Sequence, residues 1–124
     1  MKRLIQSEKD LTPDRLYNIF SNIYPEIQKG QYIGTMRAHD CDKNSMKVFK
    51  QEGLDVYIGY ALFYDKSYDD WRYAGHVFNV KNGVVIEYTD LYPLNFNDVY
   101  YFGEKVENPK LKGIFDKINS NIFK

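Results

Sequence analysis

The chain has 124 residues, of which 44% are hydrophobic and 27% charged, a composition typical of a globular rather than a disordered protein. This length fits one domain, so we expect a single domain over residues 1–124. Seventeen basic and seventeen acidic side chains cancel, and the long-range attraction that drives non-specific nucleic-acid binding is missing. We therefore expect no nucleic-acid partner.

The first residues carry charge but no apolar stretch, so they do not resemble a signal peptide. No apolar run approaches the length that spans a bilayer, and we expect no membrane partner. The single cysteine cannot form a disulfide within the chain, which fits a reducing compartment. The expected location is the cytoplasm.

Thr12 and Pro13 predict a helix start, because Thr is a good N-cap and Pro is favoured at the first helical position. Pro25 should end or kink this helix, and Gly30 closes the segment. Residues 31–40 have no clear period and are expected to be a loop. The buried stripe of the helix should consist of Leu16, Ile19, Phe20 and Ile23.

A second helix is expected over about residues 43 to 52. Asp40 or Asp42 can cap its first turn, and Gly53 can end it. Cys41 therefore lies at or just before the N-terminus of a helix.

Residues 55–64 predict a strand that is apolar on both faces, as expected of a central strand. Gly59 and Ala61 leave room on it for a close neighbour. Residues 65–73 are expected to form a polar, aromatic loop.

The segment 75–89 predicts a β-hairpin, because Asn82 and Gly83 lie between two β-branched runs. A two-residue turn puts His76, Phe78 and Glu87 on one face of the hairpin. His76 and Glu87 are then diagonal neighbours, within reach of a hydrogen bond.

A further strand is expected over residues 99–102, and a last helix should start at Asn108 and Pro109. The expected fold class is α+β, with a small antiparallel sheet (a hairpin or meander) packed against N-terminal, central and C-terminal helices. The last helix should bury Leu111, Ile114, Phe115, Ile118 and Ile122.

Cys41, His76 and Glu87 together provide the groups needed for acyl transfer. A helix N-terminus and a neighbouring imidazolium both stabilise a thiolate. A carboxylate beside an imidazole holds it in one orientation and stabilises its protonated form, which suits a general base.

These residues resemble the transglutaminase-like group of cysteine enzymes, within the broader papain-like class and among its small bacterial and phage members. The resemblance rests on Cys41-Asp-Lys-Asn-Ser45 at a helix start, the strand Val56-Tyr-Ile-Gly-Tyr-Ala61, Gly75-His-Val-Phe-Asn79 and Ile86-Glu-Tyr-Thr89. It implies that Cys41 is the nucleophile, His76 the base and Glu87 the orienting acid. The family usually has Asp in place of Glu87, Trp in place of Phe78 and Ala in place of Val77.

The function expected from the residues and the resemblance is hydrolysis of an amide or ester, or transamidation, on a protein or a small amide substrate. Asn44 either caps the helix or helps to position the substrate. Tyr57 and Trp71 would shape the cleft, the latter in an aromatic wall with Tyr68 and Tyr73. Alternatively, these loop aromatics merely pack down on the protein. No cofactor and no metal is expected.

Less specific interpretations stay open. Cys41 can be a small buried hydrophobe, His76 a core histidine and Glu87 a solvated charge. His39 with Asp40, Cys41, Asp42 and His76 contains enough ligands for a metal, but consecutive residues cannot all converge on one tetrahedral ion. Ser45 is a weaker nucleophile candidate because it lies inside the helix.

The alternative function is a non-catalytic binding or inhibitor protein of phage or mobile-element type, built on the same fold and acting on a host protein. Its small size, high Tyr content and the Glu87 departure favour this alternative. A nucleotide or small-ligand binder has no phosphate loop to support it. The oligomeric state does not follow from the sequence.

Overall fold

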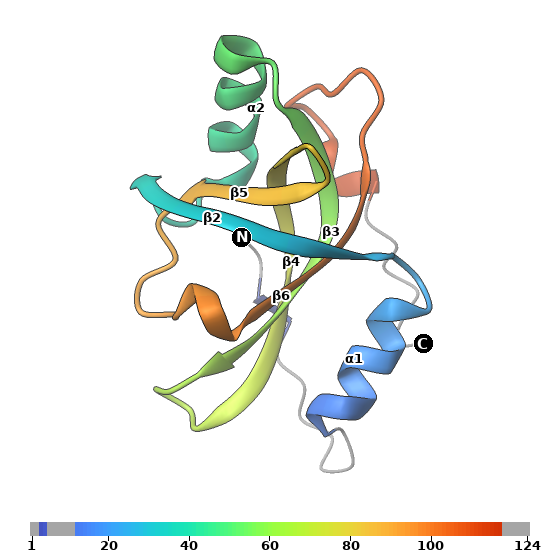
Figure 1. The fold of residues 1–124 in the computed structure, drawn as a ribbon, viewed down its shortest axis with the longest axis vertical. Coiled ribbons are helices and arrows are strands. Elements are labelled where there is room, and N and C mark those ends of the chain that lie inside the picture. Colours follow the sequence, from blue (N-terminus) through green and yellow to red (C-terminus); the bar gives the residue numbers. More distant parts are fainter. Residues whose placement is uncertain (1–2, 5–11, 118–124) are drawn as a thin grey trace.

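The computed structural model describes residues 3–4 and 12–117 (Figure 1). Its elements in chain order are β1 (Arg3–Leu4), α1 (Pro13–Ser21), β2 (Glu26–Met36), α2 (Cys41–Glu52), β3 (Asp55–Asp65), β4 (Asp70–Lys81), β5 (Val84–Thr89), the 3₁₀ turn η1 (Phe96–Asp98), β6 (Val99–Lys105) and the 3₁₀ turn η2 (Ile114–Lys117).

The strands form a closed five-stranded barrel in the order β4-β3-β6-β2-β5, with β5 pairing back onto β4. The β2–β5 pairing is parallel, and the other pairings are antiparallel. The expected small antiparallel sheet packed against three helices is therefore wrong. Two short α-helices lie outside a barrel, near its opposite ends in Figure 1.

Strands β3 and β4 are buried on both faces over most of their length, as strands of a covered barrel must be. One face of each strand points into the barrel, and the other is covered from outside. The interior cluster consists of Ala61, Phe63, Ala74, Phe78, Val80, Val85, Leu91, Val99 and Tyr101. Gly59 permits the tight approach of β6, since a Cβ there would lie 1.9 Å from the carbonyl oxygen of Phe102.

The first helix confirms its predicted start. The side chain of Thr12 accepts a hydrogen bond from the Arg15 amide at 3.2 Å, and Pro13 is the first helical residue. Leu16 and Phe20 are buried, and they pack on the outer face of the barrel against Tyr60, Leu62, Tyr73 and Phe102. The helix ends at Ser21, before Pro25.

The predicted loop over residues 31–40 is wrong in its first half, because β2 continues to Met36. Its exposed and half-buried residues do not alternate cleanly, and its register with β5 shifts twice. Gly34 has a φ of +65°, which also interrupts a regular pattern. The strand is fixed by partners distant in sequence rather than by its own periodicity.

The predicted loop over residues 65–73 is also too long. Strand β3 runs to Asp65 and β4 begins at Asp70, so Trp71 and Tyr73 lie in a strand. The predicted C-terminal helix is wrong over residues 108–113, where Asn108 and Gly113 have φ of +49° and +75°. Only η2 follows, and Ile118 and Ile122 lie outside the described residues.

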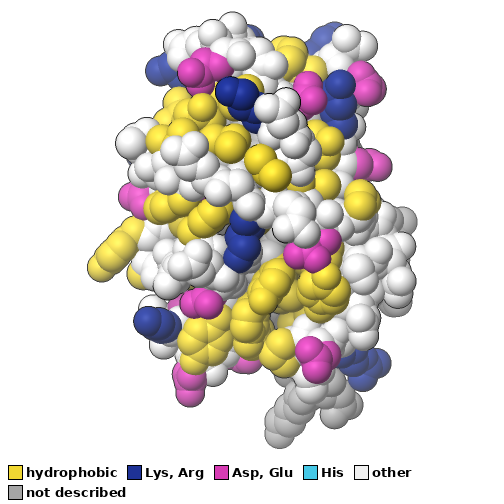
Figure 2. All heavy atoms as spheres, viewed as in Figure 1, with side chains coloured by type: hydrophobic (Ala, Val, Ile, Leu, Met, Phe, Trp, Pro, Cys, Tyr) yellow, Lys and Arg dark blue, Asp and Glu magenta, His cyan; other side chains and the backbone are white. Residues whose placement is uncertain are grey.

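On the face drawn in Figure 2, basic and acidic side chains are interspersed among apolar patches. None of the helices in the described part of the chain is both long and apolar enough to cross a membrane.

Candidate functional site

The hairpin between β4 and β5 forms as predicted. Asn82 and Gly83 have φ of +53° and +82°, the left-handed pair that a tight hairpin turn of this kind requires. The ladder pairs Lys81 with Val84, then continues through Val80–Val85 and Asn79–Ile86. The ladder with β4 ends at Ile86, whereas the parallel pairing of β5 with β2 begins at Val84 and continues to Thr89.

His76 and Glu87 meet although their strands have begun to diverge. Nε2 of His76 lies 2.5 Å from Oε1 of Glu87, and each side chain is only 1% exposed. His76 stacks on Phe78 with 5.8 Å between ring centroids. The predicted contact is confirmed, and the shared face points into the protein rather than into water.

Cys41 lies against the edge of β4 that faces away from β3. Residues Tyr73 and Ala74 pair with β1, and residues 79–81 pair with β5. Among the described residues, the stretch between these two ladders has no strand partner on that edge. The N-terminus of α2 lies there instead, and the Ser45 hydroxyl donates to the carbonyl of Val77 at 3.1 Å.

Cys41 is the first residue of α2, one turn before Ser45, and its side chain is fully buried. The amide of Val77 donates to its sulfur. Helix α2 thus satisfies both backbone groups of Val77, which brings the thiol beside His76. The predicted position of Cys41 at a helix start is confirmed.

The surroundings of Cys41 and His76 favour the charged forms of both side chains. Burial favours the neutral thiol, but the charge and hydrogen bonding of His76, with the Val77 amide, outweigh it and lower the pKa of Cys41 from 9.0. Burial likewise opposes the imidazolium, yet Glu87 and Cys41 raise the pKa of His76 from 6.5 to about 10. Both shifts favour the thiolate of Cys41 and the imidazolium of His76 over the neutral pair.

The two ring nitrogens of His76 have different partners. Glu87 occupies Nε2, which leaves the buried Nδ1 on the side of the Cys41 sulfur. Nδ1 has no hydrogen bond of normal geometry among the described residues, so its contact with sulfur is loose. Catalytic hydrogen bonds are often long until substrate binds.

Tyr101 of β6 is a site residue that the sequence did not indicate. Its hydroxyl donates to Oε1 of Glu87 at 2.9 Å, and the Thr89 amide donates to Oε2 at 3.4 Å. Burial and the Glu87 charge hold the pKa of Tyr101 well above 10, so it remains a donor. Side-chain alternation along the predicted strand 99–102 puts Tyr101 on the same face as Val99. It does not indicate which of the two faces points into the protein.

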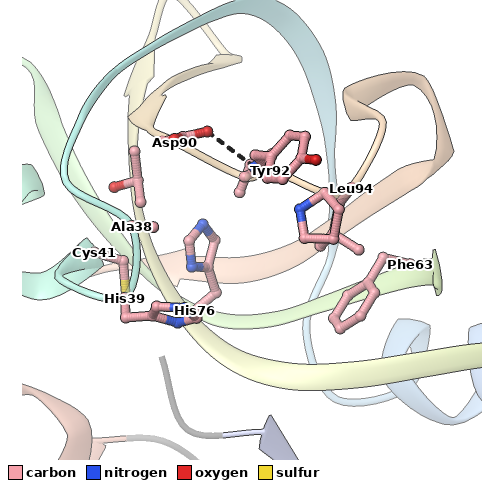
Figure 3. Close-up of a pocket in the computed structure, with 11 residues that line it drawn as sticks. Ala38, His39, Cys41, Phe63, His76, Asp90, Tyr92 and Leu94 are labelled. Atoms are coloured by element: carbon pink, nitrogen blue, oxygen red, sulfur yellow. Dashed lines mark hydrogen bonds between the residues drawn. The ribbon is translucent and has the colours of Figure 1, made fainter. Parts of the chain in front are cut away.

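A cavity of about 60 Å³ reaches the thiol and the imidazole (Figure 3). A turn over residues 90–94, also not indicated by the sequence, forms much of its wall. Tyr92 in this turn is 82% exposed. The lining residues are Ala38, His39, Cys41, Phe63, His76, Thr89, Asp90, Leu91, Tyr92, Pro93 and Leu94.

The three predicted substrate-binding residues do not line this cavity. Asn44 is buried and donates to the Arg37 carbonyl at 2.8 Å and to the Thr89 hydroxyl at 2.9 Å, so it ties α2 to the end of β5. Tyr57 packs on Phe78. Trp71 contacts Tyr64 and Tyr100 and lines a separate groove beside α1. The roles predicted for them gain no support from these positions.

No group of three or more His, Cys, Asp or Glu side chains within the described ranges could hold a metal ion. The sequence from His39 to Asp42 therefore does not assemble a site with His76 there.

Comparison with known proteins returns no match to a family model, to a curated protein or to a solved structure.

Proposed function

We propose that the chain is a cysteine-dependent acyl-transfer enzyme that hydrolyses an amide or ester, or transfers its acyl group to an amine. Cys41 is the nucleophile, His76 the general acid and base, and Glu87 the residue that orients His76. The resemblance to transglutaminase-like enzymes of bacteria and phages agrees with these roles.

The observation that carries the proposal is the two-sided environment of His76. A buried carboxylate lies at Nε2, and a thiol of lowered pKa lies on the side of Nδ1. Unpaired buried charges are costly, and a purely structural core would more cheaply contain apolar residues here. The Cys41 thiol and the His76 imidazole also line a cavity.

The chemistry follows from this arrangement. The Cys41 thiolate attacks the carbonyl carbon, and the imidazolium of His76 gives its proton to the departing amine or alcohol. Glu87 stabilises the protonated ring and holds its orientation. Water or an amine then attacks the thioester with His76 as base, which releases the acyl group and restores the thiolate.

The test uses the single cysteine, because any alkylation is then alkylation of Cys41. The rate constant with iodoacetamide is measured against pH by intact-mass spectrometry, for the folded chain and for the chain in concentrated guanidinium. We expect the rate constant of the folded protein to fall at a lower pH than that of the unfolded chain, because the fold lowers the pKa of Cys41.

Cys41→Ala should abolish labelling and hydrolysis, and His76→Gln should return the pH dependence to that of an ordinary thiol. If the folded wild type titrates like the unfolded chain, or reacts no faster than a free thiol, an activated Cys41 is ruled out.

A second candidate is a non-catalytic binding or inhibitor protein directed at a host protein. The observation in its favour is that Cys41 is 0% exposed and borders a small cavity of about 60 Å³. Exposed tyrosines such as Tyr68 and Tyr92 would supply contacts. An ordinary thiol titration together with intact folding would favour this candidate.

A reducing compartment such as the cytoplasm suits the proposed enzyme, since the free Cys41 thiol must stay reduced to act as a nucleophile. It also suits the binding protein, because the single cysteine of the chain cannot form a disulfide within it.

A further inference from the structure

We infer that the cavity beside Cys41 is an acyl-binding pocket that selects short, uncharged acyl groups. This inference rests on the proposed function, because it concerns the group that Cys41 would carry as a thioester. It adds the substrate class, which the catalytic residues alone do not define.

The size of the cavity is the first reason. A space of about 60 Å³ holds only a few non-hydrogen atoms. Cys41 and His76 contribute to its lining, so an acyl group on the sulfur would occupy it. A bulkier leaving group would have to lie towards the exposed side chain of Tyr92.

The apolar part of the cavity wall is held in place by the core, so the cavity cannot easily widen to admit a larger acyl group. Phe63 and Leu91 are 1% and 7% exposed and belong to the interior cluster of the barrel. Leu94 packs against the same cluster. Displacing such side chains to admit a longer chain would disturb a close-packed core.

The turn over residues 90–94 is also braced. The Asp90 amide donates to the Met36 carbonyl at 2.8 Å, and the Leu91 amide donates to the Tyr32 hydroxyl at 3.0 Å. The Leu94 amide closes the turn on the Leu91 carbonyl at 2.7 Å. Two of these bonds join the turn to β2, so this wall does not open without breaking them.

The charge of the lining excludes anionic acyl groups. Asp90 lines the cavity, and its Oδ1 accepts from the Tyr92 amide at 2.9 Å and from the Tyr32 hydroxyl at 3.3 Å. No Lys or Arg is among the lining residues that the structure describes. The imidazolium of His76 also lines the cavity, but it already faces the Glu87 carboxylate and the nucleophilic thiolate. The carboxylate of an anionic acyl group would therefore be repelled by Asp90 without a further cation in the described lining to offset the repulsion.

Acylation and release occur in two steps at the Cys41 sulfur. The thiolate of Cys41 forms a C–S bond to the acyl carbon, the bond to the leaving oxygen or nitrogen breaks, and the proton on His76 moves to that atom. Water then adds to the thioester and gives a proton to His76, and the C–S bond breaks to release the short carboxylic acid and the Cys41 thiolate.

The experiment measures kcat/KM for p-nitrophenyl acetate, butyrate, octanoate and mono-succinate, with acylation of Cys41 followed by intact mass. We expect acetate to be favoured over octanoate by at least about tenfold, since one methylene too many in a fitted pocket already has an effect of that size. The succinyl ester should be disfavoured against butyrate, and Asp90→Asn should reduce that difference.

Leu94→Ala enlarges the cavity and should raise the butyrate-to-acetate ratio by about tenfold. Leu54→Ala is the matched control, because Leu54 lines a separate hollow with Ile33 and Tyr88, and it should leave the ratio unchanged. If Leu94→Ala does not fold, Ala38→Leu narrows the same cavity and should lower the ratio.

Equal acylation by all chain lengths, or ratios unmoved by the folded cavity variants, overturns the inference and leaves the proposed function standing. Failure of every ester to acylate a Cys41 that still shows the lowered thiol titration also overturns the inference. Failure of that titration as well overturns the proposed function.

Discussion

The hydroxyl of Tyr101 donates a hydrogen bond of 2.9 Å to Oε1 of Glu87, the same oxygen that contacts His76. Tyr101→Phe removes only this hydroxyl. We expect kcat to fall by about tenfold, equivalent to about 1.4 kcal/mol of transition-state stabilisation. The free energy of unfolding should fall by about 1.5–3 kcal/mol, because the bond is made to a charged group.

The matched control is Tyr88→Phe, since Tyr88 donates to the exposed carboxylate of Glu52 at the same distance of 2.9 Å. It should change neither quantity appreciably. Steady-state kinetics and urea denaturation measure both variants. An unchanged kcat in Tyr101→Phe would show that the Tyr101 hydroxyl does not contribute to catalysis.

The protonation states of the pair give a pH dependence. His76 has its pKa raised to about 10, so the imidazolium persists from acid pH and is lost as pH rises through about 10. Cys41 has its pKa lowered, so the thiolate is present at high pH and is lost as pH falls through that lowered value. Activity should therefore be bell-shaped, with its alkaline limb near pH 10.

Glu87→Gln keeps the shape of the side chain and removes its charge. The alkaline limb of the pH–rate profile should move to lower pH, because Glu87 is a principal contributor to the raised pKa of His76. Glu52→Gln serves as the control, because Glu52 is the exposed carboxylate that accepts a hydrogen bond from Tyr88. It should leave the alkaline limb unchanged. A limb that stays near pH 10 in Glu87→Gln contradicts this account of His76.

At the scale of elements, α2 attaches to β4 through Ser45, whose hydroxyl is bonded to the Val77 carbonyl and is 2% exposed. Ser45→Ala leaves that carbonyl unsatisfied and should lower the free energy of unfolding by about 1–3 kcal/mol in urea titrations. Lys47→Ala, on the exposed side of α2, should stay within about 0.5 kcal/mol of wild type.

The same variant separates the two nucleophile candidates. Ser45→Ala should retain Cys41 acylation, measured by intact mass, since the Ser45 hydroxyl is engaged with the backbone. Complete loss of acylation in a folded Ser45→Ala protein would reassign the nucleophile.

Elements with strong local signals were predictable. The Thr12–Pro13 cap, the Gly53 helix end and the Asn82–Gly83 turn each depend on neighbouring residues, and all three are present. The contact of His76 with Glu87 was predicted from the turn, because alternation along a hairpin fixes which side chains share a face, and it forms although the ladder ends at Asn79 and Ile86. Local chemistry thus located two of the three proposed catalytic residues relative to each other.

Elements that depend on distant partners were not predictable. Strand β2 is held in the sheet by pairing with β5 and β6, which are distant in sequence. The residues 31–36 contain no pattern that would indicate a parallel neighbour. Tyr101 and the turn over residues 90–94 belong to the site only because the barrel closes. The apolar spacing after Asn108 predicted a helix that the left-handed residues Asn108 and Gly113 interrupt.

At the scale of the whole molecule, closure of the barrel depends on the close contact between β3 and β6. Gly59→Ala would drive a Cβ into the Phe102 carbonyl, at 1.9 Å, and neither backbone can move without opening the sheet. We expect a loss of about 3 kcal/mol or more in the free energy of unfolding, or failure to fold.

The comparison is Gly53→Ala at the end of α2, where a Cβ meets nothing within 4 Å and only the φ of +71° opposes it. Gly53→Ala should lower the free energy of unfolding by about 1–2 kcal/mol. Thermal denaturation followed by circular dichroism ranks the two variants. Equal costs would show that the β3–β6 contact does not limit the fold.

The gap on the edge of β4, between the ladders with β1 and β5, also bears on solubility. An uncovered strand edge offers free amides and carbonyls to other chains and promotes aggregation. Cys41 and Ser45 occupy the backbone groups of Val77, so the proposed catalytic helix also shields that edge. A Cys41→Ala/Ser45→Ala double variant should therefore self-associate with rising concentration, as light scattering would show, while Lys47→Ala should not.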